Sequence, residues 1–210
     1  MNKMNISSSK QSLFPTSVWK YQLQKNEQKH LNQKLTNKIL SLRSNKDSVI
    51  AANNKWYTPR NLHETPEFSM FNEFVLQASK LCLNDMHIDY EDLKITGCWG
   101  NVSGPGATHH SHSHPNNYLS GCYYLYVNEG SNTIRFHDPK PRQNIRPPIR
   151  KFTHETAETI NMTVQSGDLL LFPHWLVHSV DENQSKDNRI TIAFNIMFSN
   201  YMADMVAPMW

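Results

Sequence analysis

Four histidines lie close together near the middle of the chain, in the segment GPGATHHSHSHP: His109, His110, His112 and His114. In an extended chain, residues two positions apart point to the same face, so His112 and His114 could direct two imidazoles at one point. His110 and His112 could do the same, which leaves the register open. Imidazole binds iron, zinc, copper and nickel, so the segment is a candidate metal site, with a histidine-rich surface loop as the alternative.

A second pair of histidines follows a strand-like run later in the chain, in the segment GDLLLFPHWLVHSV. The sequence predicts a strand over Asp168–Phe172 and then a short turn that carries His174 and His178. A histidine at the end of one strand and an arginine at the start of the next lie close together in a jelly roll. We therefore expect these histidines to lie near Arg189, the first residue of the run RITIAFN.

Arg189 is charged, yet it heads a strand whose alternate residues are Ile and Phe. A charge at such a position needs a carboxylate partner. Thr191 shares the face of Arg189 and could add a hydroxyl group to the same carboxylate, and Asn195 is a further pocket candidate on that face. An ordinary salt bridge on an edge strand would also explain Arg189.

The elements that must position these groups fall into two parts. The spacing of apolar residues predicts one helix over about 27–42 and a second from near 66 to about 84–87. From about residue 92, six extended runs rich in Tyr, Ile, Val, Phe and Thr alternate with turn compositions such as GPG, NEGSN and QSGD. The sequence therefore predicts a mainly β protein, a β-sandwich or jelly roll, with N-terminal helices. We expect residues 1–92 to pack, as an extension with two helices, on a core formed by residues 93–210.

Composition limits the class of protein. The chain has 210 residues, 38% hydrophobic and 10% aromatic, which suffices for one folded core. No apolar run reaches the roughly 18 residues needed to cross a bilayer, and the N-terminus lacks the apolar region of a signal peptide. We therefore expect a cytoplasmic protein without a membrane partner. The three cysteines form no CxxC pair and are expected to stay reduced.

The distribution of charge does not favour a nucleic-acid partner. The formal net charge is only +3, and the sequence has no interleaved stripe of aromatic and basic residues. The segment KPRQNIRPPIRK over residues 140–151 is basic, and its three prolines exclude a regular strand. It is typical of a solvated surface loop, and a basic lip that contacts an acidic or phosphorylated substrate is the alternative.

Four motifs follow one another along the chain: HSHP at 112–115, SGCYY at 120–124, FPHWLVHSV at 172–180 and RITIAFN at 189–195. In this combination the chain resembles the double-stranded β-helix oxygenases that use Fe(II) and 2-oxoglutarate. It is most similar to a branch of small oxygenases with the pattern HxHP, SGxYY, FPxWLxHSV and RIxIxFN. The N-terminal LFPTSVW and NLHETPEF also resemble this branch, so the resemblance covers roughly residues 13–199. It implies a cupin-like jelly roll, Fe(II) as the metal and 2-oxoglutarate as co-substrate.

The resemblance also implies roles for individual residues. His112 and His178 match the first and last metal-binding histidines of the family and would be the catalytic ligands. Arg189, with Thr191 behind it, matches the site that holds the distal carboxylate of 2-oxoglutarate.

An aromatic hydroxyl group on the strand after the first motif often assists in this family. Tyr123 or Tyr124 could supply this hydroxyl group here. We assign Tyr123 to the cofactor-binding set. Pro115 can shift the pleat of the strand, so the choice between the two tyrosines stays open. Asn195 joins the same set. Trp99 and Asn101, on the strand before the histidine cluster, could line the pocket or simply pack in the core.

The third metal ligand departs from the common pattern. The usual facial triad is two histidines and one carboxylate, and His114 stands here where the carboxylate is expected. His114 could bind the metal and make a three-histidine site, or it could stand aside and leave a water molecule to complete the site. Asp138, in the neighbouring FHDP, could also supply a carboxylate. We favour His114, because its spacing is right and neutral imidazole binds metals.

The resemblance predicts an oxygenase that hydroxylates a protein, peptide or small molecule and releases succinate and carbon dioxide. A three-histidine cupin-like dioxygenase that does not use 2-oxoglutarate is one alternative, which Arg189 and Thr191 disfavour because it needs no carboxylate clamp. A non-enzymatic jelly-roll binding module is the other, and the spacing of His112, His178 and Arg189 argues against it. The helical N-terminal third could cover the β core or form the face of a homodimer.

Overall fold

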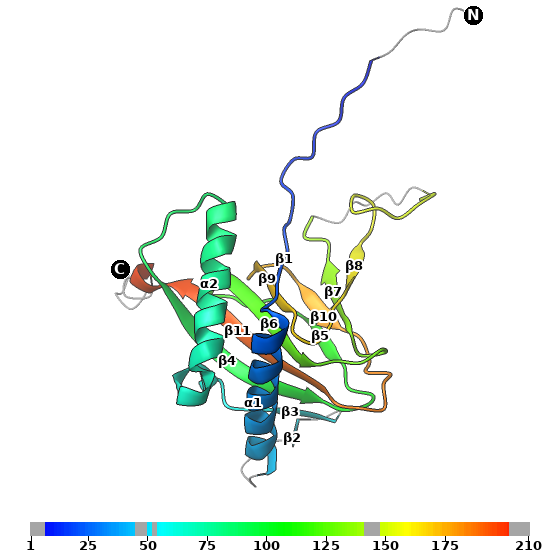
Figure 1. The fold of residues 1–210 in the computed structure, drawn as a ribbon. Coiled ribbons are helices and arrows are strands. Elements are labelled where there is room, and N and C mark those ends of the chain that lie inside the picture. Colours follow the sequence, from blue (N-terminus) through cyan, green and yellow to red (C-terminus); the bar gives the residue numbers. More distant parts are fainter. Residues whose placement is uncertain (1–6, 45–49, 52–53, 141–147, 202–210) are drawn as a thin grey trace, which may run out of the picture.

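The computed structural model describes residues 7–44, 50–51, 54–140 and 148–201. Within these ranges the strands form two antiparallel sheets (Figure 1). The larger sheet has the order β1-β9-β6-β11-β4-β3-β2. Its strands are β1 (Trp19–Tyr21), β2 (Ile50–Ala51), β3 (Lys55–Tyr57), β4 (Leu93–Ser103), β6 (Leu119–Tyr126), β9 (Leu169–Pro173) and β11 (Arg189–Phe198).

The smaller sheet carries the histidine-rich segment. It has the order β5-β10-β7-β8, so the short strand β10 pairs on both sides, with β5 and with β7. Its strands are β5 (His109–His112), β7 (Thr133–His137), β8 (Thr159–Thr163) and β10 (His178–Val180). Because β5 and β10 are neighbours, the two histidine motifs, more than 60 residues apart in the sequence, lie side by side.

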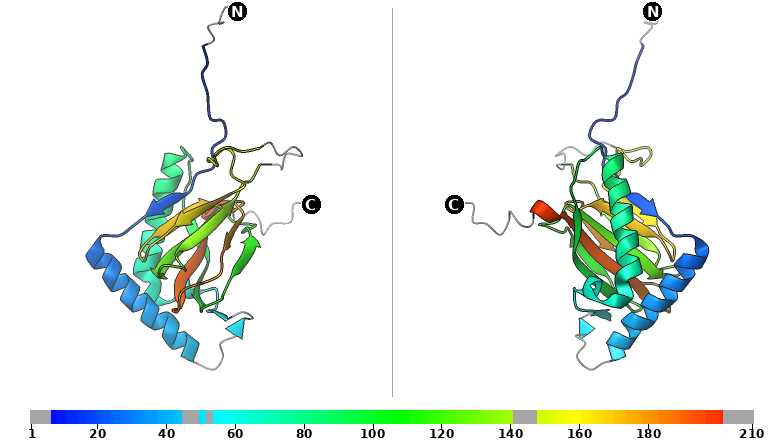
Figure 2. Two further views of the ribbon diagram at one scale, coloured as in Figure 1. Left: turned by 90° about the vertical axis from the view of Figure 1, so that its right-hand side faces the viewer. Right: turned by 60° about the vertical axis from the view of Figure 1, so that its left-hand side comes forward.

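Two helices cover the face of the larger sheet that is turned away from the smaller sheet (Figures 1 and 2). Helix α1 (Lys25–Ser44) contributes a fully buried stripe at helical spacing, Leu31, Leu35 and Ile39. Helix α2 (Ser69–Asp85) follows two 3₁₀ turns, η1 (Leu62–Glu64) and η2 (Pro66–Phe68), and contributes Phe71, Val75, Ala78 and Cys82. These stripes are the amphipathic faces that the sequence predicted.

The core consists of two layers separated by the larger sheet. The layer between the helices and the larger sheet contains the α1 and α2 stripes together with Tyr123, Ile192 and Phe194. The layer between the two sheets is smaller and contains Tyr124, Ile134, Phe136, Leu170, Phe172 and Leu176. Adjacent residues of one strand, such as Tyr123 and Tyr124, therefore lie in different layers, and only the second layer borders the histidines.

The mainly β fold with N-terminal helices is confirmed, and the predicted helices and six long strands lie close to their observed bounds. Two features differ. The segment of His178 is a strand, β10, instead of a turn, because it gains backbone partners on both sides that local sequence does not reveal. The N-terminal region also supplies β1, β2 and β3 to the edges of the larger sheet. The division at residues 92 and 93 stays a prediction.

Residues 141–147 of the basic segment 140–151 lie outside the described residues, so its proposed contact with a substrate lies outside them as well. Among the residues that the structure describes, no helix has the length and apolar character needed to cross a membrane.

Candidate metal centre

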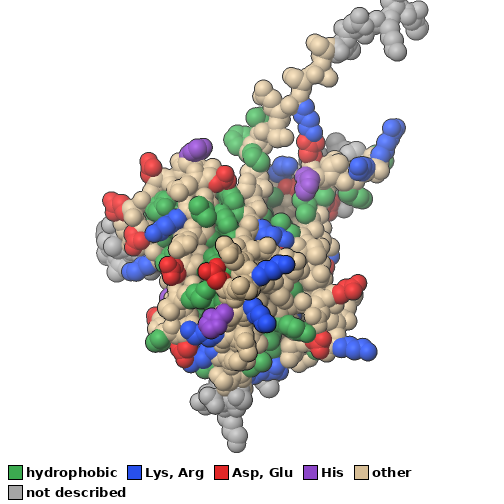
Figure 3. Space-filling view, viewed as in Figure 1, with side chains coloured by type: hydrophobic (Ala, Val, Ile, Leu, Met, Phe, Trp, Pro, Cys, Tyr) green, Lys and Arg blue, Asp and Glu red, His purple; other side chains and the backbone are tan. Residues whose placement is uncertain are grey.

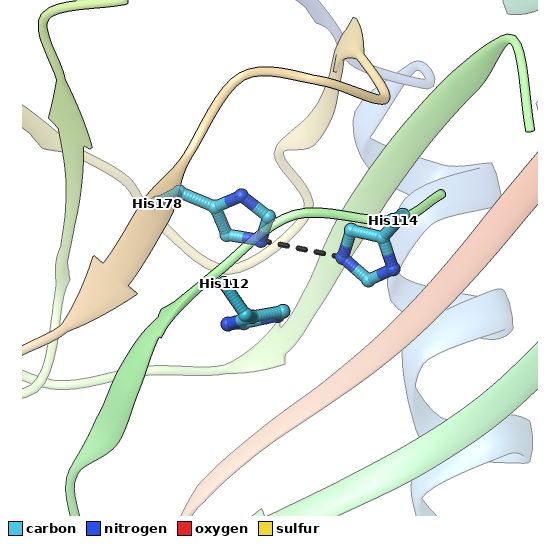
Figure 4. A group of neighbouring side chains, drawn as sticks. All are labelled: His112, His114 and His178. Atoms are coloured by element: carbon cyan, nitrogen blue, oxygen red, sulfur yellow. Dashed lines mark hydrogen bonds between the residues drawn. The ribbon is translucent and has the colours of Figure 1, made fainter. Parts of the chain in front are cut away.

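Three histidines converge between β5 and β10 (Figure 4). His112 ends β5, His178 begins β10, and the two are cross-strand partners. His114 lies two residues beyond β5, with its Nε2 atom 3.4 Å from Nε2 of His178. One ring nitrogen from each histidine lies within 4.8 Å of the other two. The structure thus brings together the three histidines that the sequence singled out as metal ligands.

Backbone carbonyl groups fix the orientation of two of these rings. Nδ1–H of His112 donates to the carbonyl oxygen of His110 at 2.8 Å, and Nδ1–H of His178 donates to that of Leu176 at 2.9 Å. In a neutral imidazole the other nitrogen is then an acceptor, so both rings turn an Nε2 lone pair toward the cluster. Such hydrogen bonds to the outer nitrogen are the usual support of metal-binding histidines.

Burial keeps His114 and His178 uncharged. Desolvation is the main cause that lowers the pKa of His178 to about 4 and that of His114 to about 3, and the neighbouring histidines lower both further. A metal ion binds only the neutral imidazole, because a proton would occupy the same lone pair. These two rings are therefore ready to bind a cation at neutral pH without first losing protons.

Aromatic rings enclose the cluster. The ring centres of Phe172 and His178 lie 4.7 Å apart, and those of Phe136 and His178 lie 6.3 Å apart. Trp99 lies on the other side, 6.2 Å from His114 between ring centres. An apolar wall of this kind limits access of water and strengthens electrostatic interactions inside the site.

Arg189 is a buried charge that lines the same pocket as the histidines. It begins β11, which lies between β6 and β4 inside the larger sheet, and only 5% of its surface is exposed. Its Nη1–H donates to the carbonyl oxygen of Thr133 at 3.1 Å. Among the described residues no carboxylate forms an ion pair with it. The edge-strand salt bridge that the sequence left open is therefore not found in the described part of the chain.

Tyr124 lies beside Arg189 in this pocket. The guanidinium carbon of Arg189 is 5.3 Å from the centre of the Tyr124 ring. Tyr124 is fully buried, and its hydroxyl group has no hydrogen-bond partner among the described residues. Burial raises the pKa of this hydroxyl well above its usual value, so it remains a proton donor. An unpaired buried hydroxyl costs free energy unless a ligand or water molecule completes it.

Thr191 and Asn101 complete this end of the pocket. The two residues are cross-strand partners on β11 and β4, and the Nδ2–H group of Asn101 donates to Oγ1 of Thr191 at 3.3 Å. This bond leaves the Thr191 hydroxyl hydrogen for a second acceptor, and the buried thiol of Cys122 lies within its reach. Oδ1 of Asn101 is buried without a partner among the described residues. The pocket that Arg189 and Thr191 share therefore has several polar groups that could form hydrogen bonds to a ligand.

The structure places Tyr123, which the sequence assigned to the cofactor-binding set, away from the pocket lining. Tyr123 pairs with Ile192, whereas Tyr124 pairs with Thr191, so Tyr124 is the tyrosine on the pocket face. The Tyr123 hydroxyl instead donates to Oδ1 of Asn32 on α1 at 2.6 Å. The register of β6 against β11 decides this, and a bulge near the end of that pairing makes it hard to read from sequence.

The structure does not bring every predicted residue to the pocket. Asn195 lies on the face of Arg189 and Thr191, but beyond the pocket lining, where its Oδ1 accepts a hydrogen bond from Oγ of Ser120 at 2.8 Å. Asp138 lies outside the histidine cluster, and its Oδ1 accepts from the backbone N–H of Lys140 at 3.1 Å. A carboxylate from Asp138 therefore does not complete the histidine cluster in this structure.

His109 lines the pocket, although the sequence did not assign it to the site. The ring of His109 stacks on that of His112, with 4.4 Å between ring centres and 18° between planes. Burial, with smaller repulsion from His112, lowers the pKa of His109 to about 3, so it is neutral. The run of histidines in the sequence indicated that His109 could belong to the site. Only the pairing of β5 with β10 shows that His109 packs against the cluster, whereas His112 is part of it.

Comparison with known proteins agrees with this geometry. Residues 97–195 match a family model described as "Putative 2OG-Fe(II) oxygenase". This region contains all three clustered histidines, Arg189 and Tyr124. A search of the curated proteins found no match.

Solved structures with the same fold are similar over most of the chain. The α-ketoglutarate-dependent epimerase SnoN of nogalamycin biosynthesis is 10% identical, with a TM-score of 0.66 over 88% of this chain and 79% of SnoN. HygX from Streptomyces hygroscopicus, solved with nickel, 2-oxoglutarate and hygromycin B, is 13% identical, with a TM-score of 0.61 over 88% and 84%. A prolyl-4-hydroxylase from Pseudomonas putida is 12% identical, with a TM-score of 0.61 over 87% and 93%.

At these identities the structural likeness shows the fold, which confirms the predicted jelly roll, and the family match over residues 97–195 gives the chemistry. Both agree with a pocket that holds a cluster of histidines and an unpaired arginine. Residues 97–195, which contain the histidine cluster and Arg189, are therefore similar to the oxygenases that depend on Fe(II) and 2-oxoglutarate.

Proposed function

We propose that the protein hydroxylates a small-molecule or peptide substrate at an iron site made by His112, His114 and His178, with 2-oxoglutarate held by Arg189. The observation that carries this proposal is the buried arginine without an anionic partner, in the same pocket as three converging imidazoles. A buried guanidinium group without a counter-charge is costly, so an anion is expected to bind there.

The residues present fit a divalent metal. Two imidazole nitrogens bound to one metal ion at about 2.1 Å lie about 3.0–3.4 Å apart, and Nε2 atoms of His114 and His178 are 3.4 Å apart. The Nδ1–H groups of His112 and His178 are already bound to backbone carbonyl oxygens. Imidazole is a ligand that iron accepts readily. His112 and His178 would hold the metal through Nε2, since their Nδ1 atoms are already bound. His114 would first move its hydrogen from Nε2 to Nδ1, because its Nε2 now donates to Nε2 of His178.

The residues around Arg189 fit a carboxylate group. The guanidinium group can donate two parallel hydrogen bonds to a carboxylate, which fixes both its position and its orientation. The unpaired Tyr124 hydroxyl and the hydrogen of the Thr191 hydroxyl could donate two more. Asn101 would orient the Thr191 hydroxyl group. Its amide N–H group donates to the Thr191 oxygen, so the hydroxyl hydrogen points away from Asn101. All these donors suit the distal carboxylate of 2-oxoglutarate.

When bound, Fe(II) would supply the reaction with dioxygen that couples decarboxylation of 2-oxoglutarate to hydroxylation of a C–H bond. The protein would supply orientation, because the clamp at Arg189 and the histidine cluster lie at fixed positions on paired strands. Phe172, Phe136 and Trp99 would exclude water around the histidines.

The proposed substrates are a small molecule or a peptide rather than a nucleic acid. The face covered by α1 and α2 carries basic and acidic side chains interspersed, which does not resemble a phosphate-binding stripe (Figure 3). One structural neighbour is named as a prolyl-4-hydroxylase and another as an epimerase of nogalamycin biosynthesis, and these names support a peptide or small-molecule substrate. A homodimer and a cytoplasmic location remain predictions of the sequence.

The test is the binding of 2-oxoglutarate, measured by anaerobic calorimetry with Mn(II) in place of Fe(II). We expect Arg189→Gln to weaken binding by about 10-fold or more, since hydrogen bonds to charged groups contribute about 1.5–3 kcal/mol. Arg135→Gln is the matched control, because Arg135 pairs with Asp181 outside the clamp. Binding of the metal without any binding of 2-oxoglutarate would reject the proposal and favour a three-histidine dioxygenase.

A further inference from the structure

We propose that the hydroxylated substrate carries an oxyanion, a carboxylate or phosphate group, and that Arg60 binds this group at the His114 end of the pocket. The inference rests on the proposed function and adds the chemical class of the substrate. It starts from an arginine that lies next to the metal cluster and that no sequence motif singled out.

Arg60 lies over Trp99, which in turn lies against the histidine cluster. The guanidinium carbon of Arg60 is 5.2 Å from the centre of the Trp99 ring, and the Trp99 and His114 rings are 6.2 Å apart between centres. The guanidinium group therefore lies at the edge of the metal site, one aromatic ring away from a proposed ligand.

The donors of Arg60 are unused. Arg60 is exposed, and among the described residues its guanidinium group forms neither an ion pair nor a hydrogen bond. The stacking on Trp99 holds the planar group by a cation–π contact and leaves its N–H groups free. An arginine with this geometry can donate two parallel hydrogen bonds to a carboxylate or a phosphate.

The backbone holds Arg60 in place before any ligand binds. The backbone N–H of Cys98 donates to the carbonyl oxygen of Arg60 at 2.8 Å, and Asn61 forms a parallel bridge with Cys98. Thr58 is tied to the same strand, since its backbone N–H donates to the carbonyl oxygen of Gly100 at 3.0 Å. Fixing the main chain of Arg60 on β4 lowers the entropy cost of using its side chain for binding.

The acidic residues of the pocket lie at its opposite end. The pairing of His178 with His112 and of Val180 with His109 means that β10 runs away from His114. Asp181 and Glu182 follow β10 and therefore lie beyond His109. Asp181 is already paired with Arg135.

At the His114 end, the polar neighbours suit an anion instead. His174 lies beside His114, whose backbone N–H donates to the His174 carbonyl oxygen at 2.9 Å. Nδ1 of His174 is buried without a partner among the described residues and can donate when it carries a hydrogen. The replacement of a carboxylate ligand by His114 also makes the metal site one charge more positive. Arg60, His174 and this extra charge all favour an anionic substrate group.

The experiment uses the full chain loaded with Mn(II) and 2-oxoglutarate, and inorganic phosphate as the probe. Bound Mn(II) enhances the ³¹P relaxation of phosphate that docks near the metal, and a Zn(II)-loaded sample gives the diamagnetic baseline. A second arm uses ¹³C-labelled acetate, so that the two oxyanions are compared at one site. Calorimetry on the same samples records whether metal and 2-oxoglutarate are bound.

We expect phosphate or acetate to show enhanced relaxation in the wild type. Their apparent affinity should fall by about 2–5-fold in Arg60→Gln, since an exposed charge contact contributes at most about 1 kcal/mol. Arg60→Lys should retain part of the effect. Lys80→Gln, at an exposed position of α2 on the other side of the larger sheet, should match the wild type. Equal enhancement in wild type and Arg60→Gln, or none in any sample that has bound 2-oxoglutarate, would overturn this inference alone. Failure of the wild type to bind 2-oxoglutarate would instead overturn the proposed function, and this inference with it.

Discussion

Arg189 lies beside Tyr124, with its guanidinium carbon 5.3 Å from the centre of the tyrosine ring. Among the described residues, the Tyr124 hydroxyl has no hydrogen-bond partner and Arg189 has no carboxylate partner. Neighbouring strands β11 and β6 place both groups in the pocket that the histidines line. A site of this composition is stabilised by an anion, and we propose the distal carboxylate of 2-oxoglutarate as that anion.

The two adjacent tyrosines of β6 should respond oppositely to removal of their hydroxyl groups. Tyr124→Phe should weaken 2-oxoglutarate binding about 5-fold, because it removes one hydrogen bond of about 1 kcal/mol, and should leave stability nearly unchanged. Tyr123→Phe should leave binding unchanged and cost about 0.5–1.5 kcal/mol of unfolding free energy, because Oδ1 of Asn32 loses its donor. Calorimetry and urea unfolding of both variants measure this; the reverse pattern would place Tyr123 in the pocket.

His114 should contribute directly to metal affinity. His114→Ala should weaken Mn(II) or Fe(II) binding by at least the roughly 10–100-fold that the loss of an outer-shell partner costs. His114→Asp should recover most of this affinity, because it restores the two-histidine, one-carboxylate triad. Asp138→Asn is the control, since Asp138 lies outside the cluster. Metal affinity of His114→Ala equal to that of the wild type would mean that water completes the site.

Acid should destabilise the metal-free protein. Burial lowers the pKa values of His109 and His178 to about 3 and about 4, below the 6.5 of the unfolded chain. Between these values the unfolded state binds more protons, so unfolding free energy rises with pH. The stability from these neutral rings is fully present above pH 6.5 and is lost as the pH falls toward 3. Urea unfolding in the presence of a chelator, from pH 7.5 downward, measures how steeply the unfolding free energy depends on pH. His109→Asn should reduce this dependence. An unfolding free energy that increases on acidification would contradict the prediction.

Gly121 should be sensitive to the addition of one methyl group. A Cβ atom there would lie 2.3 Å from the Phe194 ring and 2.6 Å from the carbonyl oxygen of Leu170, and the backbone atom cannot move aside. Gly121→Ala should therefore cost about 1–3 kcal/mol of unfolding free energy by overpacking. Gly97→Ala is the matched control on β4, where the nearest atom, in Trp99, is 3.6 Å away. Equal stability of the two variants in urea unfolding would contradict this account of the sheet.

The sequence predicts most of the fold because its elements are locally consistent. The stripe of Leu31, Leu35 and Ile39 repeats at helical spacing, and long strands such as β11 match the run RITIAFN and its continuation. Short elements could not be predicted in the same way. The three residues of β10 become a strand only because β5 and β7 pair with them, which is a tertiary effect.

The candidate site was only partly predictable for the same reason. His112, His114 and His178 could be selected from spacing and resemblance, and the structure brings them together. The choice between Tyr123 and Tyr124 depends on register, although Leu119, Tyr123 and Leu125 form an alternating apolar set that would have assigned Tyr124 to the other face.

The place of Arg60 over Trp99 could not be predicted at all. Its place beside the site depends on its backbone pairing with Cys98, on a strand nearly 40 residues later in the chain, and on the stacking of its side chain on Trp99. Neither contact leaves a periodic or motif-like signal in the segment around residue 60.

The most direct test of the account is the visible spectrum of the protein with Fe(II) and 2-oxoglutarate under anaerobic conditions. A charge-transfer band between metal and keto acid requires the metal site and the carboxylate clamp to act on one bound molecule. We predict this band in the wild type and in Tyr123→Phe, and its loss in His178→Ala and Arg189→Ala. A wild-type protein that binds one equivalent of Fe(II) and shows no band on addition of 2-oxoglutarate would contradict the account.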